Sequence, residues 1–124
     1  MYGGLVSENT AYSGAGVCNN NGTISIYAGY ITKNIASGMG GGVNNSGKFY
    51  MTGGTISKNE VTGYQQYCYG GGVFHNGGTF EMCGGSIFEN NAEKGAGIYV
   101  AHGSKWLVSG IPMVNNAIYL NSNE

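Results

Sequence analysis

Two short motifs alternate along the chain and recur from its beginning to its end. One is a run of three small residues, Gly or Ala, followed by a branched apolar residue; the other is an apolar residue followed three positions later by Asn. The first motif occupies residues 14–17, 40–43, 70–73 and 95–98, and the second occupies residues 6–9, 31–34, 56–59, 87–90 and 113–116. The asparagines are 25, 25, 31 and 26 residues apart. A period of this length predicts a solenoid, in which every repeat is one turn that packs on its neighbours.

A third part of the repeat is an alternating pair of apolar residues between the two motifs. The pairs are Ile24 and Ile26, Phe49 and Met51, Phe80 and Met82, and Trp106 and Val108. Such alternation is typical of strands, so each repeat predicts three short strands separated by bends at Gly or Asn. From the branched residue to the Asn the repeat measures 17, 16, 17 and 18 positions, whereas the segment from the Asn to the next small-residue run varies from four to ten residues. We therefore expect one loop in each turn to absorb the variation in length.

The fold class that follows is all-β: a right-handed parallel β-helix of about four and a half rungs, in a single domain over residues 1–124. Roughly 20 residues at ~3.3 Å each close a triangular circuit, and the next rung lies ~4.8 Å above it. Like residues then stack in inward columns, one of which is Val17, Val43, Val73, Ile98 and Ile118. A β-sandwich is the alternative, but it predicts hairpin turns and no fixed period.

The composition fits this fold and excludes several classes of function. The chain has 25 Gly and one Pro, as expected where bends must keep every backbone donor of a ladder. All six acidic residues are Glu and all five basic residues are Lys, so Asp-rich calcium cages and Arg phosphate clamps are absent from the sequence. The net charge of −1 gives no basis for nucleic-acid binding, and no apolar run reaches the ~20 residues of a membrane span. We expect no cofactor, no metal, no nucleic acid and no membrane insertion.

The recurring asparagines have two interpretations. As structure, they form an inward ladder in which each amide bonds the next and satisfies the backbone of the bend. As function, they bind sugars or a metal. The residues are Asn9, Asn34, Asn59, Asn90 and Asn116. The apolar residue three positions before each Asn shares its rung, so the structural ladder is our prediction.

The two motifs together resemble the repeats of chlamydial polymorphic outer-membrane proteins. Residues 53–59, Gly-Gly-Thr-Ile-Ser-Lys-Asn, are similar to the surface repeats of gut Firmicutes. Ile or Val stands where the chlamydial motif usually has Phe, which favours the Firmicutes-like version. The resemblance covers essentially the whole chain and implies export, display at a bacterial cell surface and a role as stalk or adhesin, without catalytic residues. We therefore expect a non-catalytic extracellular structural or adhesive module, either a piece of a larger surface protein or a self-stacking unit.

A polysaccharide-degrading β-helix enzyme is the alternative function. Pectate-lyase-like and polygalacturonase-like folds use Asp residues, which this sequence lacks. A pair of glutamates remains as candidate acid and base: Glu81 on an outward position, with Glu89 and Glu93 near the loop edge. Because Lys94 lies beside them, Glu89 and Glu93 are more simply interpreted as solvated charges, and we expect no enzymatic activity.

The charged residue just before each Asn recurs in register. These residues are Glu8, Lys33, Lys58 and Glu89. They are a candidate binding stripe, but opposite charges at the first and third steps favour a surface ion ladder worth at most ~1 kcal/mol per pair.

Histidines and cysteines offer candidate metal ligands. His75 and His102 each follow a predicted first strand in adjacent repeats, and Cys83 is expected on the neighbouring side. A metal site needs three convergent ligands, so two turn histidines are the favoured interpretation. Cys18, Cys68 and Cys83 are the three cysteines of the sequence, and an odd number indicates free thiols or one disulfide with a spare thiol.

The ten-residue segment 60–69 is the longest insertion in the repeat, and insertions often carry the binding function of a repeat fold. Its Tyr and Gln residues are typical of sugar and protein contact surfaces. Phe74, Tyr99 and Tyr119 are expected to add an outward aromatic column on the following strand. The candidate binding residues are Tyr64, Gln65, Gln66, Tyr67, Tyr69, Phe74 and Tyr99. A decorative loop is the alternative; as partners we consider a glycan or a host or cell-surface protein.

The ends of the chain fall within rungs. Residues 2–9 align with residues 27–34, and residues 117–120 align with a first strand. Neither end has a capping pattern, and an open β edge is a template for another strand. We therefore expect self-association through the ends, in which head-to-tail contacts that do not close give a filament.

Overall fold

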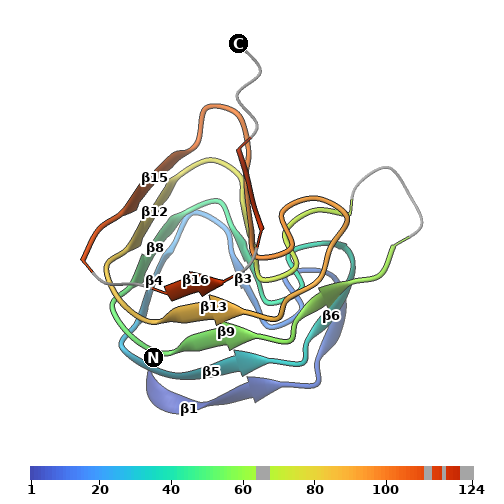
Figure 1. The fold of residues 1–124 in the computed structure, drawn as a ribbon, viewed down its shortest axis with the longest axis horizontal. Coiled ribbons are helices and arrows are strands. Elements are labelled where there is room, and N and C mark those ends of the chain that lie inside the picture. The colour runs from blue at the N-terminus through green and yellow to red at the C-terminus, as the bar shows by residue number, and fades with distance from the viewer. Residues whose placement is uncertain (64–67, 111–112, 116, 121–124) are drawn as a thin grey trace.

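The computed structural model describes residues 1–63, 68–110, 113–115 and 117–120. All regular structure in these residues is β-strand, and the chain coils as a right-handed parallel β-helix of about four turns (Figure 1). The predicted fold class is therefore confirmed. No helix in the described residues is long and apolar enough to cross a membrane.

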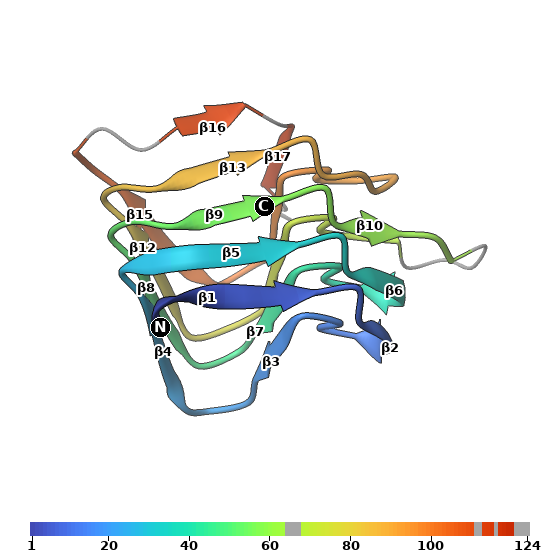
Figure 2. The same ribbon diagram turned by 90° about the horizontal axis from the view of Figure 1, so that it is seen from below.

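Four parallel sheets run along the solenoid and are named here in the order in which the chain visits them. Sheet A contains β1 (Tyr2–Ser7), β5 (Ala28–Thr32), β9 (Thr55–Ser57), β13 (Ser86–Phe88) and β16 (Met113–Asn115). Sheet B contains β2 (Thr10–Ser13), β6 (Ile35–Met39) and β10 (Glu60–Val61). Sheet C contains β3 (Val17–Asn19), β7 (Val43–Asn45), β11 (Val73–His75), β14 (Ile98–Val100) and β17 (Ile118–Leu120). Sheet D contains β4 (Thr23–Ile26), β8 (Lys48–Met51), β12 (Thr79–Met82) and β15 (Lys105–Val108). Figure 2 shows the strands of sheet A side by side in rung order.

Like residues stack in the inward columns because the register follows the sequence repeat. In sheet C, Val73 pairs with Val43 on one side and Ile98 on the other. In sheet D, the rings of Phe49 and Phe80 stack at 5.1 Å with their planes 3° apart. These side chains are fully buried, so sheets A, C and D enclose one continuous apolar core.

Sheet B is a departure from the three strands per rung that the sequence predicts. The segment expected to be a variable loop pairs with its neighbours in the first three rungs and forms a lobe beside sheet C (Figure 1). The lobe has a small core of its own, made of Ala15, Ala36, Val61 and Cys68. The sequence conceals this sheet because its inward residues are small and its strands are short.

The bends also differ from the prediction that Gly or Asn supplies every positive φ. At the corner after sheet A, the left-handed residue is the charged one that precedes each Asn: Glu8, Lys33, Lys58 and Glu89, with φ between 54° and 59°. This conformation costs roughly 1–2 kcal/mol for a residue with a Cβ. The backbone N–H that follows the left-handed residue donates to the Asn amide of the next rung, which stabilises the bend. Glycine is required at the run of small residues, where a Cβ on Gly42 would lie 2.6 Å from the Gly72 carbonyl oxygen.

The alignment of the two ends with complete rungs is confirmed. Leu5 pairs with Tyr30, as the 25-residue period predicts, while Tyr2 pairs with Ala28 across a register shift. At the other end Ile118 pairs with Ile98.

Candidate functional site

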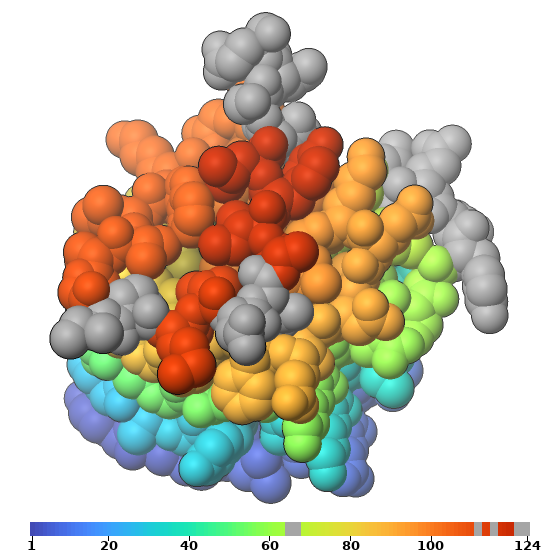
Figure 3. Space-filling model, in the orientation of Figure 1, coloured from blue at the N-terminus to red at the C-terminus, as the bar shows by residue number. Residues whose placement is uncertain are grey.

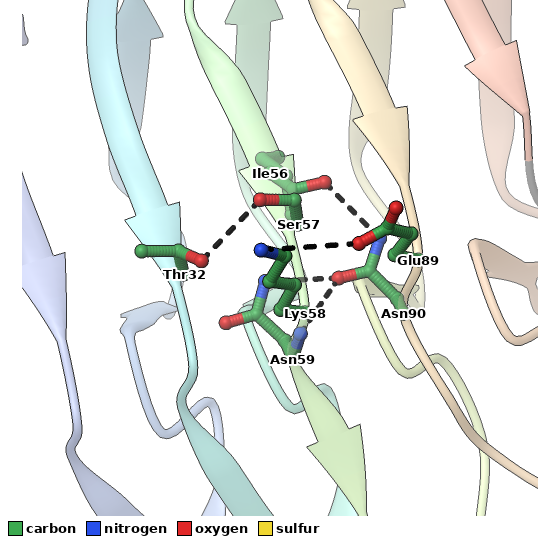
Figure 4. Close-up of polar contacts among 7 residues, drawn as sticks. All are labelled: Thr32, Ile56, Ser57, Lys58, Asn59, Glu89 and Asn90. Atoms are coloured by element: carbon green, nitrogen blue, oxygen red, sulfur yellow. Dashed lines mark hydrogen bonds and ion pairs between the residues drawn. The ribbon is translucent and has the colours of Figure 1, made fainter.

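The asparagines that follow sheet A lie in one hydrogen-bonded column at a corner of the solenoid, and Figure 4 shows the step between Asn59 and Asn90. The amide oxygen of Asn59 accepts from both the backbone N–H and the side-chain Nδ2 of Asn34, each at 3.0 Å. Asn90 accepts in the same way from Asn59, at 2.9 and 3.0 Å, and Asn34 from Asn9, at 3.1 and 2.9 Å. The Nδ2 of Asn59 donates again to the carbonyl of Ile31, at 3.0 Å. Asn34, Asn59 and Asn90 are buried within this column, whereas Asn116 lies outside the described residues.

The charged residues of the same corner are exposed. Lys58 Nζ and Glu89 Oε2 are 4.0 Å apart and form the only ion pair among the described residues (Figure 4). The other opposite pair expected from the sequence, Glu8 with Lys33, is not within ion-pair distance. With one long contact between solvated side chains, this stripe contributes little to stability.

A second polar ladder, which the sequence analysis did not identify, runs along the inside of sheet C. Asn19 Nδ2 donates to Asn45 Oδ1 at 2.8 Å, and Asn45 Nδ2 lies 3.1 Å from His75 Nδ1. All three side chains are buried. A signal was present in the sequence, because each of these residues stands two positions after the branched residue of the first motif.

The two histidines lie on adjacent rungs, as predicted, but only one of them lies in a turn. His75 is a strand residue inside the core, and its partner one rung later is Val100. His102 lies in an exposed turn. Within the described residues, no three His, Cys, Asp or Glu side chains come together as metal ligands. Cys83 is exposed, as is Cys18, and the buried Cys68 donates its thiol to the Gly63 carbonyl; none of the three forms a disulfide.

The candidate binding residues of the insertion divide into two groups. Tyr64, Gln65, Gln66 and Tyr67 lie outside the described residues. Tyr69, Phe74 and Tyr99 form a ring cluster, in which Tyr69 stacks on Tyr99 at 4.4 Å and Phe74 lies 5.4 Å from Tyr99.

This ring cluster is closed rather than open to solvent. Phe74 and Tyr99 point outward from sheet C, as predicted, but they are only 6% and 5% exposed because the lobe and Tyr69 cover them. Tyr119 continues the column at 5.0 Å from Tyr99 and is exposed, with Lys94 Nζ 5.3 Å from its ring centroid. Tyr119 is therefore exposed and Tyr69 half-buried, whereas the rings of Phe74 and Tyr99 are closed to solvent.

A second aromatic surface lies on the outer face of β1 and β5. Tyr2 and Tyr27 stack at 4.8 Å, and the neighbouring Leu5 and Tyr30 pair in register. All four side chains are well exposed, and no charged residue belongs to their columns. The sequence analysis missed this surface because these tyrosines do not follow either motif.

The glutamates of the enzyme hypothesis lie on different sheets. Glu81 is half-buried on the outer face of sheet D, between Tyr50 and Leu107 in its column. Glu89 follows strand β13 of sheet A and contacts Lys58.

The last rung lies at the C-terminal face of the solenoid (Figure 3), and it leaves residues of the inward columns exposed. Ile118 is 41% exposed and Val108 is 39% exposed, whereas their equivalents Ile98 and Met82 in the rung below are fully buried. At the opposite face, no donor among the described residues bonds the amide oxygen of Asn9. One face therefore exposes apolar side chains that are buried in the other rungs, and the other face exposes an amide acceptor of the first ladder.

Comparison of the chain with protein-family models, with curated proteins and with solved structures gives no match.

Proposed function

We propose that this chain is a non-catalytic structural and adhesive module of an extracellular, cell-surface protein. The observation that carries the proposal is the continuous stack. Neighbouring rungs pair through parallel sheets A, C and D, the first three rungs also pair through sheet B, and two polar ladders with buried side chains run along the stack. A unit of this kind is stabilised by nearest-neighbour contacts and leaves its outward positions free to vary. The resemblance to bacterial surface repeats supports the extracellular location.

The adhesive part of the proposal rests on exposed aromatic side chains. Exposed apolar patches mark interaction sites, and Tyr combines an apolar ring with a hydroxyl group. The candidates are the surface of Tyr2, Leu5, Tyr27 and Tyr30, and the residues of the insertion around Tyr69. A glycan or a cell-surface protein is the expected partner.

End-to-end assembly is the structural part of the proposal. A second copy placed head to tail continues sheets A, C and D and covers Ile118 and Val108, which the last rung leaves exposed. It also supplies donors to Asn9 with the same polarity as the rest of the ladder.

The experiment that tests the function compares binding with degradation. The purified chain is incubated with a panel of neutral and acidic polysaccharides, while bound protein and newly formed reducing ends are measured together. We expect binding to at least one polymer, weakened by Tyr30→Ala but not by Tyr12→Ala, which alters an equally exposed Tyr on the lobe. Depolymerisation that Glu81→Gln abolishes would instead establish the enzyme alternative.

A further inference from the structure

The second ladder ends in a histidine that takes the place of an amide. In the two earlier rungs the Asn Nδ2 donates to a backbone carbonyl one rung later, that of the first residue of the sheet D strand in that rung. His75 makes the equivalent contact through Nε2. The carbonyls belong to Lys48, Thr79 and Lys105, at 3.0, 3.3 and 2.6 Å from the nitrogens of Asn19, Asn45 and His75.

These contacts define the tautomer of the His75 ring. The Lys105 carbonyl can only accept a hydrogen bond, so Nε2 carries the proton. The Asn45 Nδ2 can only donate, so Nδ1 is the acceptor. The orientation of the Asn45 amide is fixed in turn, because its oxygen accepts from Asn19 Nδ2 at 2.8 Å and from the Gly47 N–H at 3.2 Å. The ladder therefore requires a neutral imidazole.

A second proton on the ring conflicts with this arrangement. It places an N–H at Nδ1 directly against the N–H of Asn45, so that two donors face each other. Rotation of the Asn45 amide removes the clash, but it breaks the bonds to Asn19 and Gly47. Buried groups left without partners cost ~1–3 kcal/mol each, so the closed corner takes up the proton less readily than the open one.

We propose that His75 makes this corner of the solenoid acid-sensitive: protonation at Nδ1 turns its ring from acceptor to donor and opens the second ladder between β7 and β11. The inference concerns the stability of the fold and does not depend on the proposed function.

No charged side chain of the described residues faces the ring to hold the extra proton. The ring lies 5.7 Å from that of Phe80 on β12, with Val100 of β14 as its partner in register. The charged residues of the adjacent strands, Lys48, Glu81 and Lys105, occupy the outer face of sheet D.

The direction of the pH effect follows from this burial. Burial lowers the pKa of His75 below its ordinary value, and hydrogen bonds with the backbone of Lys105 and Asn45 oppose the shift in part. The closed corner is therefore fully stable above about pH 6.5, where an exposed His is also neutral. As the pH falls below that value the open form takes up a proton first, and the opening equilibrium rises by up to ~10-fold per pH unit until the pKa of the closed form is passed.

Native-state amide hydrogen exchange, corrected for the intrinsic pH dependence of exchange, tests the proposal. The Gly47 N–H, which depends on Asn45, is compared with the Asn34 N–H, which belongs to the first ladder. Between pH 6.5 and 5.5 we expect protection of Gly47 to fall by up to ~10-fold while that of Asn34 is unchanged. An equal loss at both amides, or no loss at Gly47, would overturn the proposal.

Two variants and one spectroscopic measurement complete the test. His75→Asn restores an amide to the column and should make the protection of Gly47 independent of pH; His102→Asn, which alters the exposed histidine, should behave like the wild type. Persistent pH dependence in His75→Asn would contradict the assignment. If that variant does not fold, nitrogen NMR of the wild-type rings decides: we expect the Nε2–H tautomer for His75, and an Nδ1–H tautomer would refute the mechanism.

Discussion

Replacing one amide of the first ladder should destabilise the solenoid far more than replacing its charged neighbour. In Asn59→Leu the side chain keeps its approximate volume but loses all four of its hydrogen bonds. The backbone N–H of Asn34 and the carbonyl of Ile31 each lose their contact with the Asn59 amide, and Asn34 Nδ2 loses one of two contacts. Asn90 still accepts from the Asn59 backbone N–H.

The magnitude follows from these losses. Three buried polar positions at ~1 kcal/mol or more each give a loss of about 3 kcal/mol or more, a large share of the ~5–15 kcal/mol that stabilises a typical domain. Lys58→Ala removes one exposed contact of 4.0 Å and should cost at most ~1 kcal/mol. Asn91→Leu makes the same chemical change at an exposed residue, the one that follows Asn90, and serves as the matched control.

Urea unfolding followed by circular dichroism measures the difference. We expect the midpoint of Asn59→Leu to fall well below those of Lys58→Ala and Asn91→Leu, with similar slopes. Equal midpoints for the three variants would refute the conclusion that the ladder stabilises the fold.

Two further substitutions test close packing along the stack. Gly42→Ala should destabilise the fold strongly, because the new Cβ would lie 2.6 Å from the Gly72 carbonyl oxygen and 2.9 Å from Asn59 Nδ2. Gly3→Ala, whose Cβ would have nothing within 4 Å, should be nearly neutral, and similar thermal midpoints for the two variants would contradict this reasoning. Tyr69→Ala should cost ~0.5–1.5 kcal/mol of stability for the lost stacking on Tyr99, in addition to the lost burial. It should also expose Phe74 to an apolar dye; unchanged dye binding would show that the lobe alone closes the cluster.

The fold was predictable from the sequence because one structural rule repeats in every rung. The same residue type recurs wherever the same environment recurs, so one pattern is seen several times and is not a coincidence. Examples are the valines at 17, 43 and 73 and the asparagines at 9, 34, 59 and 90. The β-helix and the alignment of its ends follow from this repetition alone.

What the sequence did not reveal depends on contacts that break the repeat. His75 takes the place of an amide in the second ladder because its ring nitrogens reach the same positions, although His does not resemble Asn. Considered only as a candidate metal ligand, it was predicted to lie in a turn. Sheet B is built on Ala11, Ala36 and Val61, whose small side chains give little alternation. The burial of Phe74 and Tyr99 depends on Tyr69, which reaches them only because the lobe folds against sheet C.

Sedimentation of the purified chain at tens of micromolar tests the central proposal, a structural unit whose rungs continue from copy to copy. We predict large, concentration-dependent species for the wild type and for Thr55→Glu, which adds a charge on the side of a middle rung. Ile118→Glu adds the same charge to an inward column at the exposed end and should give a monomer. A wild-type chain that sediments as a monomer throughout this range would contradict end-to-end assembly.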